Sequence, residues 1–470
     1  MAMVVKNNMS AIHTLNTLNQ NSSALTKSLA KVSSGMKINT AQDDASGYAI
    51  SERMRVQIRS LDQANQNTQN DLSMMKTAEG AVSSTVEILK SLKEKAINAA
   101  NDSNTDSDRQ TIQKEIDQFI DQIDDNALTT FNGKYLVDGS KGYRSESGTK
   151  TAFTNQSLAT NTTAFSTLVG IKNRNNEDLE ITSTDRVTAS FVRNGKTYVT
   201  TFHVTSETTL NDIFSNLNSV ATAAGITQVF GSARFSQDTP HNLDVKGTGK
   251  ETPADGLVHN GAMIGTNAAG DAVRTADGTS GLTVTAYTIG YGNKGGQIAG
   301  VNISITDSQG NVKKAANAAL DQFKLSIREQ NKSEDNSLNF HVGAEANVAI
   351  KVGLTDMRSE ALGLKGSEGT KLSVATKEFA NAAVNVITNA LQKAVDQQTD
   401  IGAVEARLEY TSSNLTTSSE NVQNAESTIR DADMAKEMTN YTKNNVLLQA
   451  AQSMLAQANQ NSSAVLSLLQ

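Results

Sequence analysis

The chain has 470 residues but no cysteine and no tryptophan. The absence of cysteine excludes disulfides, thiolate metal sites and a cysteine nucleophile. Aromatic residues account for only 4% of the chain and apolar residues for 37%. These fractions are low for a chain of this length, so the composition favours an elongated protein over one with a single large compact core.

Long apolar runs are missing as well. No stretch approaches the roughly 18 residues that a membrane helix requires. The first residues, MAMVVKNNMSAIHTLNTLNQ, contain a short apolar patch but not the apolar core of a cleaved signal peptide. They indicate either a cytosolic protein or one exported with its N-terminus intact, and the composition leaves both open. With a net charge of −7 and no basic stripe, the chain does not fit a nucleic-acid-binding protein.

Only two prolines are present, Pro240 and Pro253, so no proline interrupts a helix in residues 1–239 or 254–470. Asp43 or Asp44 is expected to cap a long helix, about 85 Å in length, that ends in the loop 101–107. Apolar residues in this stretch recur at spacings of three, four and seven, which predicts a narrow heptad seam. The seam consists of Met54, Ile58, Leu61, Thr68, Leu72, Met75, Val82, Val86, Leu89 and Leu92.

A second helix is expected to follow and to fold back on the first, because Ser107 and Gln110 form a capping-box pattern ahead of apolar residues at helical spacing. These apolar residues are Ile112, Ile116, Phe119 and Ile123. Near the other end of the chain, a seven-residue repeat predicts a third long helix. The repeat consists of Ile401, Leu408, Leu415, Val422 and Ile429. Three long helices with narrow seams can satisfy one another only as a bundle.

The middle of the chain has a different pattern. Residues 186–204 alternate in polarity on both sides of Asn194-Gly195, which predicts a β-hairpin. Residues 128–140, LTTFNGKYLVDGS, indicate a second hairpin, residues 339–354 a strand pair, and residues 208–220 a short helix. The predicted fold is therefore mainly α: a long antiparallel coiled-coil or helix bundle formed by both chain ends. A β-rich α+β domain, or two small ones, is inserted in the middle.

The sequence contains no recognisable catalytic motif. None of its five histidines lies in an H-E-x-x-H frame. The stretches GNKGG (292–296) and GTGKET (247–252) do not complete a phosphate-binding loop and fit turns better. Asp43 and Asp44 could suggest a carboxylate site, but capping of a helix N-terminus explains them better. We therefore predict that the chain is not an enzyme and binds no cofactor or metal.

Both ends of the chain resemble bacterial flagellin. The segments VSSGMKINTAQDDASGYAISERM (32–54) and IRSLDQANQNTQNDLSMMKTAEGA resemble the N-terminal signature of that family. The segments NVQNAESTIRDADMAKEM (421–438) and LLQAAQSMLAQANQNSSAVLSLL (447–469) resemble its C-terminal signature. FHVGAEANVAI and DMRSEALGL resemble the β-element of its shaft. The resemblance covers residues 1–140 and 339–470, in the family's order, and leaves the middle unmatched.

The resemblance implies a structural subunit that polymerises into the flagellar filament for swimming. Export uncleaved by the flagellar type III route, to the extracellular flagellum, is also implied. Residues 1–44 and 431–470 would be helices of the inner filament core, residues 45–140 and 339–430 the two parts of the helical bundle, and residues 141–338 a variable surface domain. The implied partners are further copies of the chain, an export chaperone, the filament cap and the hook-junction proteins, with no nucleic acid and no membrane insertion.

The terminal segments are expected to assemble the filament. Their seams are too thin to bury enough apolar area alone, so we expect them to be disordered in the monomer and to fold on docking. Gly35 and Gly47 are expected near a break between a core helix and a bundle helix. Both ends contain NQNSSA, at residues 19–24 and 459–464, and both copies would border the inner core, although the repeat itself is interpreted as partly coincidence. The candidate assembly residues are Leu15, Leu18, Leu25, Leu29, Val446, Leu447, Met454, Leu455, Val465 and Leu468.

The resemblance also implies recognition by the vertebrate Toll-like receptor for flagellin, through a motif on the long bundle helix. The matching residues here are Lys90, Ser91, Leu92, Lys93, Glu94, Lys95 and Ile97, together with Glu115 on the following helix. Ser91 replaces an arginine of the motif and Lys95 replaces a leucine. Serine cannot supply the bidentate hydrogen bonds of arginine, and burying a lysine charge is costly. Receptor signalling weaker than that of the full motif is therefore expected.

Two alternatives stay open on the sequence. A hook–filament junction protein shares helical ends with flagellin, although its match to DDASGYAI and to the C-terminal tail is usually looser. A cytosolic coiled-coil signalling protein resembling the chemoreceptor hairpin would also show heptad seams, but a full receptor would need membrane helices.

Overall fold

The computed structural model describes residues 8–144, 151–159, 162, 164–226, 229–230, 257–258, 263–266, 272–274, 281–286, 298–328 and 333–468. The chain divides into two compact units. The first unit contains Met1–Asn70, His341–Ala349 and Leu408–Gln470, and the second contains Asp71–Phe340 and Ile350–Arg407. Each unit therefore combines segments from both halves of the sequence.

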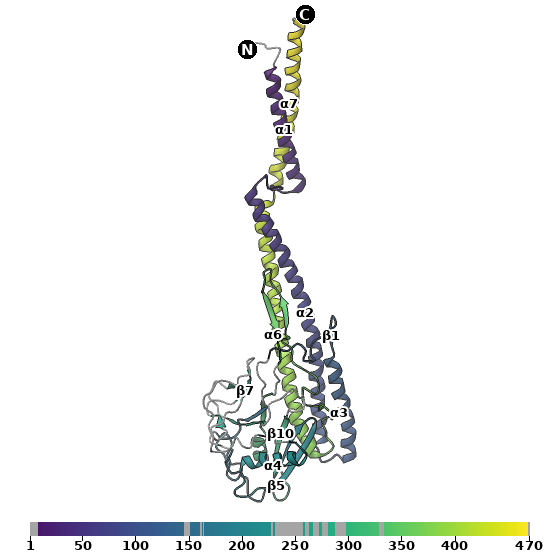
Figure 1. Ribbon diagram of the computed structural model, residues 1–470, viewed down its shortest axis with the longest axis vertical. Helices are drawn as coiled ribbons and strands as arrows, with labels where there is room; N and C mark the ends of the chain where they lie inside the picture. The colour runs from purple at the N-terminus through teal and green to yellow at the C-terminus, as the bar shows by residue number, and fades with distance from the viewer. Residues whose placement is uncertain are drawn as a thin grey trace. The chain divides into compact units, whose positions relative to one another are not determined.

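The described part of the chain contains long helices at both ends and short ones in the middle (Figure 1). They are α1 (Met9–Ser34), α2 (Ala45–Ala99), α3 (Asp106–Ala127), α4 (Leu210–Ala223), α5 (Lys314–Leu320), α6 (Lys377–Arg430) and α7 (Met434–Leu468). The three predicted bundle helices correspond to α2, α3 and α6, and the predicted short helix corresponds to α4. The predicted fold class is confirmed. None of the described helices is both long and apolar enough to cross a membrane.

The start of α2 is capped by one of the two aspartates that the sequence indicated. The Oδ1 atom of Asp44 accepts hydrogen bonds from the main-chain N–H groups of Ser46 and Gly47, both at 3.0 Å. Asp43 instead holds the preceding turn, where its Oδ2 accepts from the N–H of Thr40 at 3.1 Å. Hydrogen bonds to the charged form lower the pKa of both carboxyls.

The predicted capping box of α3 was wrong by two residues. The box is formed by Thr105 and Asp108: the N–H of Thr105 donates to Asp108 Oδ2 at 2.9 Å, and the N–H of Asp108 donates to Thr105 Oγ1 at 3.3 Å. The buried Arg109 adds a tertiary tie, since its guanidinium donates to the carbonyl of Ala99 at 2.9 Å and to that of Asn101 at 3.1 Å. These bonds hold the loop against the end of α2 and start α3 earlier than the local pattern suggested.

The heptad seams are buried as predicted along most of their length. In the second unit, α2 buries its seam from Leu72 to Leu92, and α3 and α6 bury residues at matching spacings. The fully buried members include Met75, Val82, Leu89, Leu92, Ile116, Ile120, Ile123, Val386, Ile387 and Ile401. In the first unit a smaller cluster joins Leu61, Ala64 and Leu415. The polar seam residue Thr68 is also buried, and its hydroxyl donates to the carbonyl of Ala64.

The described strands form short sheets. They are β1 (Thr130–Phe131), β2 (Lys134–Tyr135), β3 (Ala152–Asn155), β4 (Arg186–Arg193), β5 (Lys196–His203), β6 (Leu257–Val258), β7 (Met263–Thr266), β8 (Ala272–Arg274), β9 (Gly281–Thr285), β10 (Ile298–Thr306), β11 (Lys324–Ile327), β12 (Leu338–His341) and β13 (Ala349–Val352). The sheet orders are β10-β4-β5 and β11-β3-β9-β6, with the pairs β1-β2, β7-β8 and β12-β13. The hairpins predicted at residues 128–140 and 186–204 and the strand pair at 339–354 are confirmed.

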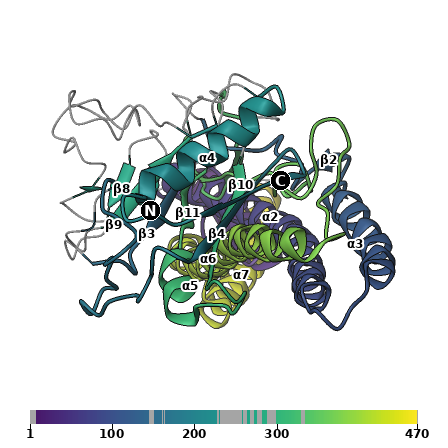
Figure 2. The same cartoon turned by 90° about the horizontal axis from the view of Figure 1, so that it is seen from below.

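The described part of the insertion shares one hydrophobic core, which runs from Phe153 to Phe323. Helix α4 packs across the β4–β5 hairpin (Figure 2). Its Phe214 makes edge contacts with Phe230 and Phe323, at ring-centroid distances of 5.4 and 5.5 Å. The two larger described sheets of the insertion and both short helices, α4 and α5, contribute residues to this one cluster.

One edge of the insertion's β-sheet is closed by side chains instead of a further strand. The outer edge of β10 faces α5, its C-cap residue Asp321, and α6, whose amide and carboxylate groups recur at the spacing of the main-chain groups left free on β10. The side-chain amides of Asn389 and Asn385 donate to the carbonyls of Ala299 and Val301, at 3.0 and 3.2 Å. The N–H groups of Ile303 and Ile305 donate to the Oδ1 atoms of Asp321 and Asn317, at 3.2 and 2.6 Å. An edge satisfied in this way cannot pair with another strand.

Candidate assembly and recognition surfaces

The two terminal helices lie side by side in the first unit (Figure 1). Asn8 donates to the carbonyl of Ala458 at 3.2 Å, and Asn21 donates to the carbonyl of Leu447 at 3.2 Å. Nearer the other end of α1, Asn444 donates to Ser28 Oγ at 3.0 Å. Because the partners of later residues in α1 come earlier in α7, the pair is antiparallel, and asparagines supply its hydrogen bonds.

The NQNSSA repeat does not pair with itself. Asn21, in the first copy, bonds to Leu447, and Ala24 accepts from Asn444 at 3.5 Å. The first copy therefore lies opposite residues near 444–449, whereas the second copy begins directly after Ala458, which accepts from the N-cap residue Asn8 of α1. The repeat thus marks two similar helix surfaces and not a self-complementary contact.

The pairing of α1 with α7 leaves five of the eight described candidate assembly side chains exposed. The exposed ones are Leu15 (45%), Leu29 (50%), Val446 (58%), Leu447 (41%) and Met454 (62%). Leu18, Leu25 and Leu455 are partly buried, and the side chains of Val465 and Leu468 lie outside the described part. Among the described side chains of these two helices, Ser28 and Ala451 are the buried ones. The helix pair therefore has almost no apolar core of its own and presents apolar side chains to its surroundings.

Both terminal helices are separated from the bundle helices by short breaks that lie together. Helix α1 ends at Ser34 and is capped by Gly35, whose φ of +73° is the left-handed conformation that glycine adopts readily. On the other chain segment, α6 ends at Arg430 and α7 begins at Met434. The N–H of Lys37 donates to the carbonyl of Arg430 at 2.8 Å, and the N–H of Ala432 donates to that of Gly35 at 2.9 Å. The expected break near Gly35 and Gly47 is therefore present, and we call residues 35–44 and 430–433 the joint.

Arg430 is the central side chain of the joint. It is 5% exposed, and its Nη1 atom donates to Glu52 Oε1 at 2.6 Å. Its guanidinium also donates to the sulfur of Met36 at 3.1 Å and lies 5.4 Å from the centre of the Tyr48 ring. The hydrogen bond from Arg430 is the largest cause of the lowered pKa of Glu52. Arg430 is not among the residues that the sequence indicated, although a single arginine directly before Asp-Ala-Asp (431–433) was the available signal.

The candidate recognition stretch lies on α2 in the second unit and is not uniformly accessible. Leu92 is 1% exposed and belongs to the bundle core, so it cannot contact a receptor in the folded chain. Ile97 is 54% exposed. Lys90 pairs with Glu87 at 2.7 Å, and Glu94 is exposed while Ser91 and Lys93 are partly exposed.

The structure joins two of the candidates directly. Lys95 Nζ lies 2.8 Å from Glu115 Oε2, with side-chain exposures of 36% and 45%. The substituted lysine and the acidic residue of the next helix therefore neutralise each other. A partner cation that approaches Glu115 would compete with Lys95 for the carboxylate.

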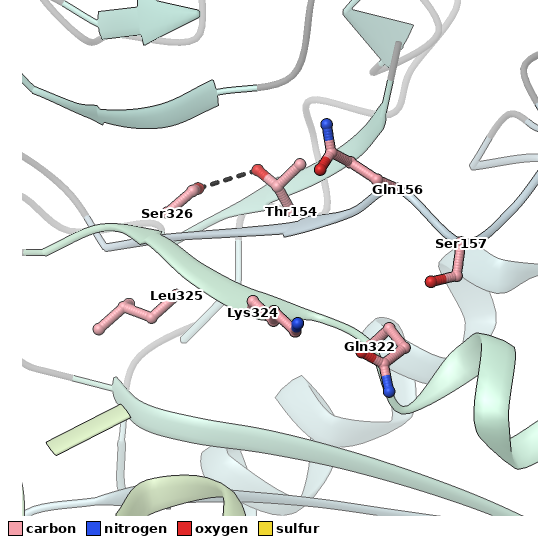
Figure 3. A pocket seen from close by; sticks show the side chains of 7 residues that line it. All are labelled: Thr154, Gln156, Ser157, Gln322, Lys324, Leu325 and Ser326. Carbon is pink, nitrogen blue, oxygen red and sulfur yellow. Dashed lines mark hydrogen bonds between the residues drawn. The ribbon is translucent and has the colours of Figure 1, made fainter. Parts of the chain in front are cut away.

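The insertion also contains a polar pocket of about 280 Å³ beside β3 and β11 (Figure 3). Thr154 and Ser326 share a hydrogen bond of 2.8 Å at its wall. The pocket is lined by Thr154, Gln156, Ser157, Gln322, Lys324, Leu325 and Ser326. Among the described lining residues Lys324 is the charged one, and none of them carries a carboxylate or an imidazole that could act as a general base. No cluster of three potential metal ligands occurs among the residues with assigned positions.

Comparison with known proteins identifies the family. The bacterial flagellin N-terminal helical region matches residues 5–142, and the bacterial flagellin C-terminal helical region matches residues 384–469. A flagellin of Clostridium tyrobutyricum is 32% identical over 460 residues, which cover 97% of this chain and 99% of that protein. The chain belongs to the flagellin family. The resemblance of both terminal regions to flagellin, which the sequence indicated, is confirmed.

Other flagellins match as completely. A flagellin of Bacillus subtilis is 28% identical, covering 99% of this chain and all of that protein. The B-type flagellin of Pseudomonas aeruginosa is 30% identical, with full coverage of both chains. As a flagellin, the chain is a structural subunit that assembles with further copies into the extracellular flagellar filament. These flagellins match over the whole length of the chain, which does not favour the alternatives of a junction protein or a signalling coiled coil. Membership of a structural family agrees with the predicted lack of enzymatic activity.

Proposed function

We propose that the α1–α7 pair is the assembly surface of this filament subunit, and that residues 1–44 and 431–470 form the inner filament core. Residues 45–140 and 339–430 are the two parts of the bundle domain, and residues 141–338 are the variable surface domain. The observation that carries the proposal is the row of exposed apolar side chains on a helix pair with almost no core of its own. Neighbouring copies would bury these side chains, and the hydrophobic effect would then stabilise both the helices and the polymer.

Seeded polymerisation tests this assignment with two matched variants on α7. Met454→Lys places a charge on a side chain that is 62% exposed in the single chain, and Gln452→Lys places the same charge on an exposed polar position two residues away. Burying a methionine contributes about 1.5–3 kcal/mol, which corresponds to a tenfold or larger change in subunit affinity. We expect Met454→Lys to slow elongation on filament seeds and Gln452→Lys to elongate normally.

Removal of residues 431–470 is the stronger perturbation. It should abolish polymerisation while the second unit stays folded, as judged by circular dichroism and by its protease resistance. Normal filaments from the truncated chain, or equal elongation by both point variants, would overturn the assignment of the terminal helices to the core.

We further propose export without cleavage by the flagellar type III route, assisted by an export chaperone, with growth beneath a filament cap on hook-junction proteins. Two features support passage through a narrow channel. The chain has no cysteine to form a disulfide before export, and helices with little buried apolar surface unfold at low cost. The mass of protein sheared from filaments tests the route: an intact N-terminal peptide is expected, and a shortened one would contradict it.

The last part of the proposal is weakened recognition by the vertebrate flagellin receptor. The Lys95–Glu115 pair supports it, because a receptor cation would have to compete with Lys95 for the Glu115 carboxylate. Ser91→Arg combined with Lys95→Leu restores the motif and releases Glu115, so we expect higher potency in a receptor reporter assay. Lys90→Arg, which keeps the charge beside Glu87, is the control. Unchanged potency of the double variant, at unchanged thermal stability, would refute the proposal.

A further inference from the structure

Two asparagine–glycine turns lie in contrasting surroundings within the second unit. Asn132-Gly133 joins β1 to β2, and Asn194-Gly195 joins β4 to β5. The asparagines have φ values of +49° and +54°, and the glycines have φ values of +73° and +71°. These are the paired left-handed conformations of a tight hairpin turn. The local chemistry of the two turns is therefore the same, and any difference in reactivity must come from the structure around them.

The turn at Asn132 is open. Asn132 and Gly133 are both exposed, and no described atom lies within 4 Å of a Cβ placed on Gly133. Strands β1 and β2 contain two residues each, and such short hairpins are only marginally stable. The Asn132 side chain makes no hydrogen bond within the described part of the chain. Opening of this turn should therefore cost little free energy.

The turn at Asn194 is closed. It connects two strands of eight residues, and Gly195 is buried. A Cβ on Gly195 would collide with the carbonyl oxygen of Thr370, and a Cβ on Gly366 would collide with that of Asn194. The hairpin tip is thus docked, main chain against main chain, on the loop 366–370. Opening it requires the loss of this contact as well as of the strand pairing.

We propose that Asn132 is a site of spontaneous deamidation and isomerisation, and that docking protects Asn194 from the same reaction. A base removes the proton from the Gly133 amide nitrogen, which attacks Cγ of Asn132. The Cγ–Nδ2 bond breaks, ammonia leaves, and a five-membered succinimide forms. Water then adds to either ring carbonyl and leaves aspartate or isoaspartate at position 132. The net reaction consumes one water, releases one ammonia and involves no oxidation or reduction.

The rate of this reaction follows the opening of the turn. The Gly nitrogen and the Asn Cγ can meet only after the asparagine ψ leaves its turn value, so a hairpin that opens easily reacts faster. The product adds a negative charge beside Lys134, and isoaspartate also lengthens the main chain by one methylene at the tip of β1–β2. Because the change is irreversible, its extent would increase with the age of the chain.

Peptide mapping by mass spectrometry of the full-length chain, incubated in mildly alkaline buffer, tests the proposal. We expect deamidation at Asn132, with both aspartate and isoaspartate products, at least about tenfold faster than at Asn194, because local opening free energies differ widely within one protein. Gly133→Ala should remove most of the reaction at Asn132. Asn260-Gly261 lies outside the described residues and is quantified separately.

Two further measurements identify the cause of the difference. In denaturant, Asn132 and Asn194 should react at similar rates. Gly366→Ala, which displaces the docked tip, should accelerate the reaction at Asn194 and leave Asn132 unchanged. Equal rates at both sites in the native chain, or faster reaction at Asn194, would overturn the proposal. A rate difference between Asn132 and Asn194 that persists in denaturant would also overturn the proposal, because its cause would then be the local sequence and not the folded structure.

Discussion

Replacing Arg430 should weaken the joint selectively. Arg430→Met keeps an apolar stem of similar length but removes the cation that binds Glu52 at 2.6 Å and faces the Tyr48 ring at 5.4 Å. A charge-assisted hydrogen bond contributes about 1.5–3 kcal/mol net, and a cation–π contact adds about 1 kcal/mol. Glu52 is 41% exposed and can return to water, which reduces the loss. We therefore expect a local destabilisation of about 2 kcal/mol.

Hydrogen exchange measures this change at the affected residues. Amides near the end of α6 should lose about 30-fold in protection, which is the equivalent of about 2 kcal/mol, whereas the amides of α3 should be unaffected. Arg55→Met is the matched control on the same helix pair. Arg55 is 42% exposed and meets Glu52 and Glu426 at 3.4 and 4.0 Å, so its loss should cost no more than about 1 kcal/mol.

The two variants should also differ in assembly. If the joint positions the terminal helices, Arg430→Met should elongate filament seeds more slowly than Arg55→Met at equal helix content. Equal protection of the α6 end in the two variants would refute the energetic reasoning. Normal elongation by Arg430→Met despite lost protection would show that assembly does not depend on a rigid joint.

Two further comparisons use pairs of variants with opposite expected signs. Burial raises the pKa of Asp321 to about 6, and the hydrogen bonds that the carboxyl accepts offset this only partly. The carboxyl therefore favours folding at acid pH, and this contribution is lost as the pH rises through 6. Asp321→Asn should stabilise the chain at neutral pH, by about 1–3 kcal/mol, and should not stabilise it below the usual pKa of an aspartate. Hydrogen bonds, above all from Asn311, lower the pKa of Asp307, so its contribution to stability is present at neutral pH and lost in acid. Asp307→Asn should therefore lower the melting temperature at neutral pH only. A stability difference that does not depend on pH, for either variant, would contradict the assignment. Gly47→Ala should destabilise the start of α2, because its Cβ would lie 2.5 Å from Asp44 Oδ2. In the same helix the Cβ of Gly80→Ala would meet open space, so this variant should stabilise the helix by about 0.5–1 kcal/mol. Thermal unfolding measures both changes.

Local sequence determined most of the secondary structure and the family. Heptad spacing located α2, α3 and α6, because a narrow seam of apolar side chains has a period that belongs to helices alone. The Asn-Gly pairs located two hairpins, because they combine the two positive φ values that tight turns require. The terminal signatures were long enough to indicate flagellin, and the absence of cysteine excluded whole classes of site.

Tertiary structure decided what these elements contact. The α3 cap moved to Thr105 because Arg109 ties the loop to α2, a contact between residues of different elements. The sequence placed Leu92 both in the heptad seam and in the recognition motif, and the structure decides for the seam, because Leu92 is 1% exposed.

The sequence also does not show which distant residues pair in the joint and in the candidate recognition stretch. Arg430 and Glu52 lie 378 positions apart in the chain, and Lys95 and Glu115 lie on different helices. Asn132 and Asn194 have the same local sequence signal, and only the packing around each turn distinguishes them. A sequence records which groups are available along the chain, whereas the free energy of burial and of pairing depends on which distant groups the fold brings together.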